Sequence, residues 1–248
     1  MKVLSFYNIK GGVGKTTFAV NTAFEAARTG LKTLLWDLDP QASASYILRI
    51  APKFKGDIKR VGEKNPGLSK SIKETDWPLL DILPGDFELR TLSQNLQDHK
   101  RQANRLNFSI KYLQPDYDLI VIDSPPEASL VSENIINSSN LICAPVIPNY
   151  LSLNSLDQFT VFVDRAKKKG TNTCAAFNFV DQRKRLHKEI IQSYLGSDPR
   201  FIDHFIPASS LVESMTTRRN PVQCISPNSI VAQAFKNICE DLLTLIND

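Results

Sequence analysis

One glycine-rich stretch constrains this chain more than any other feature of its sequence. It follows the apolar run 3–7 and reads Asn8-Ile9-Lys10-Gly11-Gly12-Val13-Gly14-Lys15-Thr16-Thr17. Because glycine has no Cβ, the backbone there can turn sharply and direct several N–H groups into one concavity. A helical pattern begins near Thr16, and a helix N-terminus attracts anions through its dipole. The stretch therefore has the layout of a phosphate-binding loop.

The side chains of this loop suit a nucleoside triphosphate. We expect Lys15 to reach terminal phosphate oxygens and the Thr16 hydroxyl to ligate the accompanying Mg²⁺. The usual pattern G-x-x-x-x-G-K-[ST] places a glycine at residue 9, where this chain has Ile9, but the loop adds a second lysine. A glycine-rich turn that binds nothing is the alternative, which two lysines and three glycines disfavour. The expected nucleotide contacts are Lys10, Gly11, Gly12, Val13, Gly14, Lys15, Thr16 and Thr17.

Length and composition favour a single α/β domain over residues 1–248, with 42% hydrophobic and 23% charged residues. No apolar run is long enough to span a bilayer, and the N-terminus lacks a signal-peptide layout, so we expect a cytoplasmic protein. The net charge of +4 permits nucleic-acid binding without establishing it. The four cysteines are scattered, which is typical of small buried side chains in a reducing compartment.

The order of the predicted elements indicates a doubly wound α/β fold. Helix 16–28 and strand 33–36 complete a strand–helix–strand unit, so the first two strands should be parallel. Further strands are predicted at 79–83, 118–123, 141–146, 173–179 and 205–207. Helices are predicted at 87–113, 152–168, 211–216 and 229–246, with a short one near 68–72 in the poorly patterned segment 49–76.

Two acidic residues follow predicted strands, and ligands of an open parallel sheet lie beyond the carboxyl ends of its strands. Asp39, in the run Asp37-Leu38-Asp39-Pro40-Gln41, could orient an attacking water or hold a metal-bound water. Asp123, in the run Asp123-Ser124-Pro125-Pro126, occupies the place of a Walker B carboxylate near Mg²⁺. A plain turn at Asp39 is the alternative, which the nearby glycine loop disfavours.

These motifs resemble those of the deviant Walker ATPases of the ParA/MinD family. The signature K-G-G-x-G-K-T-T, then D-x-D-P-Q and D-x-P-P, match in order and spacing, and the resemblance covers nearly the whole chain except 49–76. It implies a P-loop NTPase fold, with about seven or eight mostly parallel strands and helices on both faces. It also implies ATP and Mg²⁺ as cofactors, a nucleotide-sandwich homodimer in the ATP state, and slow hydrolysis controlled by a partner protein.

The resemblance also assigns residues to roles. Lys10, Lys15 and Asp39 would act in catalysis, with Lys10 reaching across the dimer to the other subunit's phosphates. Thr16, Asp39 and Asp123 would surround Mg²⁺. Asn178 would contact the adenine, unless it only caps the end of its strand. The implied nucleotide contacts beyond the loop are Gln41, Asp123, Asn178 and Pro207.

The family has two branches that this chain could join. MinD-type members bind membranes through a C-terminal amphipathic helix, which needs a basic polar face. Here residues 235–248 carry three acids against one lysine, which favours a core-packed helix and no membrane. ParA-type members bind DNA non-specifically and move plasmids, chromosomes or other cargo with a ParB-like or other adaptor. Two basic clusters favour this nucleoid-associated branch: Arg183, Lys184, Arg185 and Lys188, and then Arg218 and Arg219.

Two other classes of function stay open at this point. One is a nucleotide-gated scaffold without significant turnover. The other is a metabolic enzyme that uses the same loop for electron transfer or ligase chemistry. Electron transfer would need cysteines placed to hold an iron–sulfur cluster, and Cys143 lies inside an apolar strand. Because the loop starts at residue 10, we expect no N-terminal helix-turn-helix and no sequence-specific operator binding.

Overall fold

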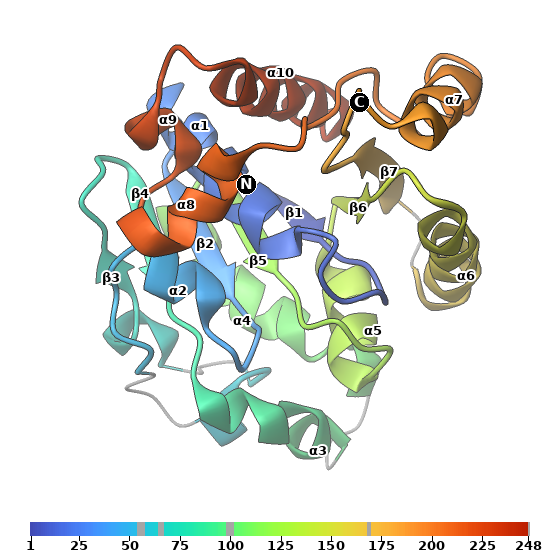
Figure 1. Ribbon diagram of the computed structural model, residues 1–248. Coiled ribbons are helices and arrows are strands. Elements are labelled where there is room, and N and C mark those ends of the chain that lie inside the picture. Colours follow the sequence, from blue (N-terminus) through green and yellow to red (C-terminus); the bar gives the residue numbers. More distant parts are fainter. Residues whose placement is uncertain (54–57, 64–66, 98–101, 168–169, 248) are drawn as a thin grey trace.

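A central β-sheet organises the computed structural model, which describes residues 1–53, 58–63, 67–97, 102–167 and 170–247 (Figure 1). Within these ranges the sheet has seven strands in the order β3-β4-β2-β5-β1-β6-β7, and only β3 is antiparallel to its neighbour. The strands are β1 (Lys2–Phe6), β2 (Thr33–Asp37), β3 (Lys73–Glu74), β4 (Leu80–Leu83), β5 (Leu119–Asp123), β6 (Leu141–Val146) and β7 (Asn172–Phe177).

The register of three central strands sets the position of the functional site. β1 and β2 each pair in parallel with β5, which lies between them, so the predicted parallel orientation of the first two strands is confirmed. Phe6 at the end of β1 and Asp37 at the end of β2 both lie opposite Asp123 at the end of β5. All five residues of β5 are buried, as expected of a central parallel strand. The glycine loop and both acidic segments therefore leave the sheet at one edge.

Helices cover both faces of the sheet, which confirms the doubly wound fold (Figure 1). One face packs against α1 (Lys15–Arg28), α2 (Ser43–Ile47), α8 (Ser210–Arg218), α9 (Val222–Ile225) and α10 (Ile230–Leu245). The other packs against α3 (Leu92–Gln97), α4 (Leu106–Leu113), α5 (Leu130–Ser138) and α6 (Tyr150–Ala166). Beyond β7, α7 (Arg185–Tyr194) contacts the sheet through Ile190 and through Tyr194, whose ring meets Phe177.

The C-terminal helix belongs to the core. The Phe18 ring of α1 lies between Phe6 of β1 and Phe235 of α10, with ring centroids 5.7 Å and 5.8 Å apart. Phe235, Ile238 and other apolar residues of α10 are buried. The predicted core-packed helix is therefore confirmed. In the described part of the chain, no helix combines the length and apolar character needed to cross a bilayer.

Several predicted boundaries differ from the structure. The helix predicted at 87–113 is instead a 3-10 segment (Phe87–Thr91), α3, a 3-10 turn (Gln102–Asn104) and α4. The two helices bury separate apolar residues, Leu92 and Leu96 in α3 and Leu106, Ile110 and Leu113 in α4. Segment 205–207 is not a strand in the structure and makes an isolated bridge, Val180 to Pro207.

Some elements were absent from the prediction, namely α2, α5, α7, α9 and β3. The short helix expected near 68–72 is a 3-10 turn, Leu68–Lys70. The expected helix end at Lys168 and parts of segments 49–76 and 87–113 lie outside the described residues.

Candidate nucleotide-binding site

The glycine loop joins β1 to α1 through left-handed backbone that favours glycine. Gly14 caps α1 in the left-handed region, with φ of +100°, and Gly12 has φ of +71°. A Cβ on Gly14 would lie 2.1 Å from the side-chain nitrogen of Asn178. The sequence therefore needs glycine at residue 14 for both its conformation and the approach of a side chain from the end of β7.

The Lys15 side chain folds back over the loop instead of extending into solvent. Its Nζ donates to the carbonyl oxygens of Asn8 and Lys10, both at 3.2 Å. Burial lowers the pKa of Lys15, and the carboxylates of Asp123 and Asp39 oppose that shift. The ammonium group therefore lies within electrostatic reach of both predicted acids, which the sequence had placed only on separate strands.

The Asp123 carboxylate is fully buried at the sheet edge. Neither of its oxygens has a hydrogen-bond partner of standard geometry among the described residues. Burial raises its pKa well above the usual value and Asp37 adds to the rise, whereas the Thr16 hydroxyl and Lys15 oppose it. An unsatisfied buried carboxylate beside a hydroxyl supplies the hard oxygen ligands that Mg²⁺ prefers. Asp123 and Thr16 thus suit the ion chemically, and the predicted metal role of these two residues and of Asp39 stays a prediction.

Asp37 was not assigned a role from the sequence. Its Oδ2 accepts hydrogen bonds from the backbone N–H (2.9 Å) and the hydroxyl (2.7 Å) of Ser45 in α2. Burial raises the pKa of Asp37 to about 6, and the Ser45 hydrogen bonds oppose this rise. Asp37 therefore anchors α2 to the end of β2. The only sign of this contact in the sequence is that Ser45 follows Asp37 by eight positions, and such a spacing is common by chance.

Asp39, two residues after Asp37, is half-buried. Its Oδ1 accepts a 2.9 Å hydrogen bond from the backbone N–H of Gln41, so the turn considered as an alternative is present. The Gln41 side chain is exposed. A turn that holds the Asp39 carboxylate at the edge of the site is compatible with the catalytic role, which stays a prediction.

Lys10 lies on the side of the loop that faces α6. Its Nζ donates to the Ser152 hydroxyl at 3.0 Å, and its backbone N–H donates to Oδ1 of Asn8 at 3.0 Å. Tyr150 and Leu151, in the first turn of α6, are 69% and 75% exposed. The predicted reach of Lys10 into a second subunit would therefore begin by breaking its contact with Ser152.

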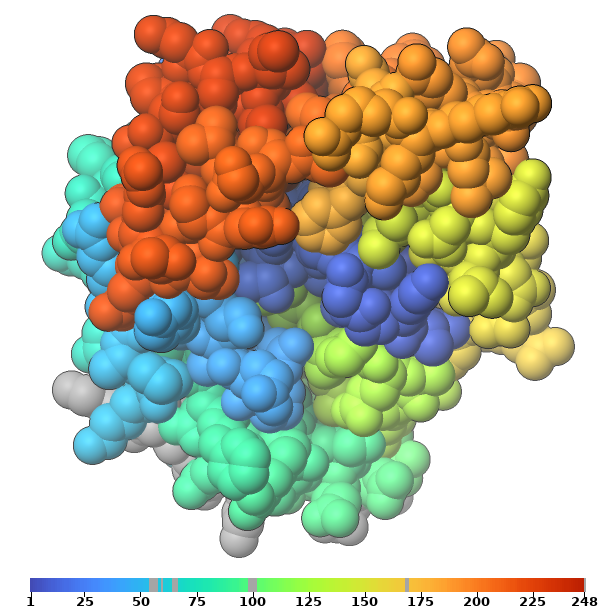
Figure 2. Space-filling view, viewed as in Figure 1, coloured from blue at the N-terminus to red at the C-terminus, as the bar shows by residue number. Residues whose placement is uncertain are grey.

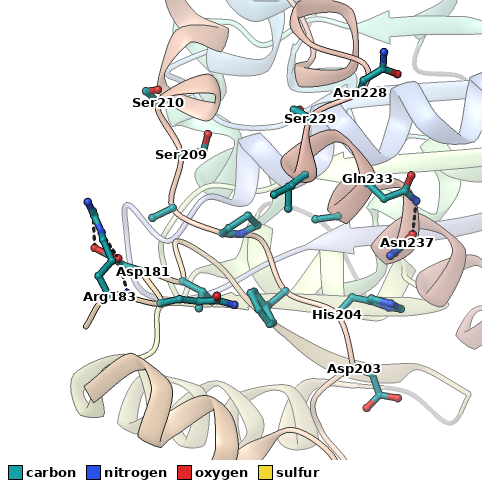
Figure 3. A pocket seen from close by; sticks show the side chains of 17 residues that line it. Asp181, Arg183, Asp203, His204, Ser209, Ser210, Asn228, Ser229, Gln233 and Asn237 are labelled. Atoms are coloured by element: carbon teal, nitrogen blue, oxygen red, sulfur yellow. Dashed lines mark hydrogen bonds and ion pairs between the residues drawn. The ribbon is translucent and has the colours of Figure 1, made fainter. Parts of the chain in front are cut away.

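Asn178, the predicted adenine contact, and Pro207, a further predicted nucleotide contact, have different surroundings. Asn178 is fully buried, and its side-chain amide donates to the carbonyl oxygen of Val13 at 2.7 Å. Pro207 lines a cavity of about 940 Å³ that also reaches Arg183 and α10 (Figure 3). In that view Gln233 and Asn237 of α10 lie across the cavity from Arg183. The structure thus links Asn178 to the phosphate loop, and adenine recognition by Asn178 and nucleotide contact by Pro207 stay predictions.

The two predicted DNA clusters lie apart, with α7 and α8 on opposite sides of the view in Figure 1. In the first, Arg183 makes a two-pronged ion pair with Asp181, and Arg185 pairs with Glu189 at 2.7 Å. Lys184 and Lys188 are exposed. In the second cluster, which consists of Arg218 and Arg219, the former is exposed and the latter contacts α2.

The parallel sheet, the glycine loop, the buried lysine and the two strand-end acids together define a P-loop nucleoside triphosphatase. Comparison with known proteins narrows this class. A family model described as an AAA domain matches residues 1–176. The chain is 28% identical to a ParA family protein of Mycoplasma pneumoniae, over 99% of this chain and 98% of that protein.

Solved structures agree with these comparisons. A putative plasmid partition protein from Borrelia burgdorferi, solved with AMPPNP, superimposes with a TM-score of 0.82 at 25% identity, covering 98% of each chain. A cobyrinic acid a,c-diamide synthase from Mycobacterium smegmatis, solved with ADP and magnesium, reaches a TM-score of 0.83 at 21% identity, covering 98% of this chain and 94% of that one. The second likeness speaks only to the fold. This chain belongs to the ParA/MinD family of Walker-type ATPases.

Proposed function

We propose that this protein is a ParA-type partitioning ATPase. With ATP and Mg²⁺ it forms a sandwich dimer, and the dimer binds DNA without sequence preference. A ParB-like or other adaptor then stimulates slow hydrolysis, and the cycle positions a plasmid, a chromosome or another large cargo. The protein works in the cytoplasm on the nucleoid. The name of the Mycoplasma relative and the plasmid-partition name of the Borrelia structure support this branch of the family.

One observation carries the catalytic part of this proposal. Lys15 begins α1 directly after the loop that leaves β1, and the ends of β1 and β2 both lie opposite Asp123, so Lys15, Asp39 and Asp123 gather at one end of the sheet. Phosphoryl transfer needs positive charge at the phosphates, a metal ligand, and a group that orients water. These three residues provide the three functions in one place, at the N-terminus of α1.

Each residue has a defined task in this mechanism. The loop N–H groups and Lys15 bind the terminal phosphates. Thr16 and Asp123 would hold Mg²⁺, which when bound neutralises phosphate charge. Asp39 orients the water that attacks the γ-phosphorus as the bond to the β-phosphate oxygen breaks. Lys10 of the second subunit stabilises the charge that develops on the phosphoryl oxygens, as arginine fingers do, so hydrolysis depends on dimerisation.

A phosphate-release assay tests this function directly. The purified chain is incubated with ATP and Mg²⁺, with and without random-sequence duplex DNA, and its size is measured with a non-hydrolysable ATP analogue. We expect slow release, stimulation by DNA together with a ParB-like adaptor, and a dimer with the analogue but not with ADP. A wild type that stays monomeric with the analogue would contradict the sandwich dimer. Absence of phosphate release would support the nucleotide-gated scaffold instead.

A further inference from the structure

The ends of α2 and α8 are joined by reciprocal hydrogen bonds between residues that are about 170 positions apart. Nε of Arg219 donates to the carbonyl oxygen of Tyr46 at 2.8 Å, and Nε of Arg49 donates to the carbonyl oxygen of Arg219 at 3.0 Å. The Arg219 guanidinium also lies over the Tyr46 ring, 4.6 Å from its centroid. The light-blue ribbon of α2 lies next to the orange ribbon of α8 in Figure 1, and light-blue and orange atoms adjoin in Figure 2.

Both arginines adopt the left-handed backbone conformation, which is energetically costly for residues that carry a Cβ. Arg49 has φ of +64° and Arg219 has φ of +51°, and each follows the last turn of its helix. Glycine or asparagine is usual at such a position. Residues that keep a left-handed conformation at a cost tend to gather where function requires them. Two arginines in contact thus keep this conformation at positions where glycine or asparagine would cost less.

The surface around this contact is basic and accessible. The Arg49 side chain is 45% exposed, Arg218 is exposed, and Tyr46 is 50% exposed. Asp76 pairs with Arg49 at 3.1 Å, but its own side chain is 60% exposed, and exposed pairs of this kind are weak. A phosphate group can therefore compete with Asp76 for the Arg49 guanidinium, whose planar fork matches phosphate geometry.

We propose that Tyr46, Arg49, Arg218 and Arg219 form a single phosphate-binding surface for DNA, here named the α2–α8 face. Arg49 and Arg218 contact backbone phosphates. Arg219 is a positioning residue, because its guanidinium is engaged by Tyr46 and its carbonyl oxygen holds Arg49. This inference rests on the proposed DNA binding and deepens it. It adds Arg49, from the segment that the sequence left without a role, and gives Arg219 a different task.

The test measures affinity for a random-sequence duplex by fluorescence anisotropy, using the full chain with Mg²⁺ and a non-hydrolysable ATP analogue over a salt series. Arg49→Gly should keep the melting temperature, because glycine relieves the left-handed backbone, and should weaken DNA binding several-fold. A dimer loses two contacts, so the slope of log affinity against log salt should fall by roughly 1.8. Asp76→Asn should strengthen binding because it frees Arg49. Arg165→Ala, which removes one exposed charge from α6, is the matched control.

Each outcome separates this inference from the function on which it rests. The α2–α8 face is overturned if Arg49→Gly binds DNA as tightly as Arg165→Ala does. It is also overturned if Asp76→Asn shows no gain in DNA affinity. Arg219→Ala removes the side chain that Tyr46 engages, so DNA affinity should fall although Arg49 and Arg218 remain, and full retention of DNA binding would overturn the positioning role. A wild type that binds no duplex contradicts the proposed DNA function itself. The wild type and Arg49→Gly are also tested for binding to phosphatidylglycerol vesicles. If Arg49→Gly loses vesicle binding but keeps the DNA affinity of the wild type, DNA is not the partner of this face.

Discussion

Asn178 and Val13, 165 positions apart in the sequence, are joined by a 2.7 Å hydrogen bond from the asparagine amide to the valine carbonyl oxygen. The bond links the end of β7 to the phosphate loop. Both residues are fully buried, so water cannot replace either partner. The loop conformation therefore depends on a residue that the sequence suggested only as an adenine contact or a strand cap.

Replacing Asn178 should loosen the loop. Asn178→Ala leaves the Val13 carbonyl unpaired, which should cost about 1–3 kcal/mol in the free energy of unfolding. ATP affinity should fall as well, because the loop N–H groups lose their fixed directions. Asn140→Ala is a matched control, since Asn140 accepts a 2.8 Å hydrogen bond from the Val3 backbone away from the loop. Urea unfolding and binding of a fluorescent ATP analogue measure the two effects. An equal loss of ATP affinity in both variants would contradict this account.

The central strands and the glycine loop could be predicted because their signals are local. An apolar run, three glycines and a lysine specify the loop, and each acid follows its own strand directly. The bond between Asn178 and Val13 could not be predicted, because it depends on how the end of β7 meets α1. The α7 helix was missed although Leu186, Ile190 and Tyr194 recur at a helical spacing. Polar and charged residues make up most of this helix, so its apolar stripe is narrow.

The two catalytic assignments predict opposite defects. Lys15→Ala should abolish ATP binding, because it removes the charge nearest the phosphates. Asp39→Ala should keep ATP binding and lose turnover by about 100-fold or more, the usual contribution of a group that acts on the attacking water. Equilibrium binding and phosphate release on the same preparations distinguish these results. If Asp39→Ala hydrolyses ATP at the wild-type rate, the catalytic carboxylate has been assigned wrongly.

The contact between Lys10 and Ser152 leads to a prediction about assembly. Lys10→Ala should remain folded and bind ATP, yet lose hydrolysis, because the second subunit no longer receives a positive charge at its phosphates. Ser152→Ala should not reduce hydrolysis, because it removes only the partner that holds Lys10 within its own subunit. Phosphate release together with size measurement in a non-hydrolysable analogue checks both variants. Normal turnover by Lys10→Ala would exclude the role across the dimer.

His187 should make the α7 region sensitive to acid. Its Nδ1 accepts a 3.0 Å hydrogen bond from the Asp181 backbone N–H, which requires the neutral ring. Burial lowers its pKa, Lys184 lowers it further, and Asp181 opposes the shift. The unfolded chain then binds more protons than the folded chain as the pH falls below about 6.5, so stability declines there.

A variant without a titrating ring isolates this effect. His187→Asn keeps an acceptor at the same branch of the side chain, so it should lose less stability than the wild type between pH 7.5 and pH 5.5. Urea unfolding at the two pH values measures the difference. A parallel loss in both proteins would show that His187 does not carry the dependence.

The roles of the basic residues illustrate the limit of sequence reasoning. Arg218 and Arg219 are adjacent in the sequence and were assigned the same task. In the fold, Arg218 is exposed, whereas the side chain of its neighbour donates to Tyr46. Arg183 and Arg185 each have an acidic partner within a few residues, so their net field is weaker than a count of basic residues implies. Charge counts indicate a partner class, and only the fold shows which side chains are available.

The measurement that tests the central claim most directly is the nucleotide dependence of DNA binding by the wild type. A gel shift on random duplex and co-sedimentation with anionic liposomes are run on one preparation, without nucleotide, with ADP, and with ATP and Mg²⁺. We predict a gel shift only with ATP, and the shift should not depend on the duplex sequence. The log of the DNA affinity should fall against the log of the salt concentration with a slope of roughly 0.9 per phosphate contact. The protein should not sediment with liposomes. ATP-dependent sedimentation with liposomes and no DNA shift would contradict the partitioning function and place the chain in the membrane-binding branch.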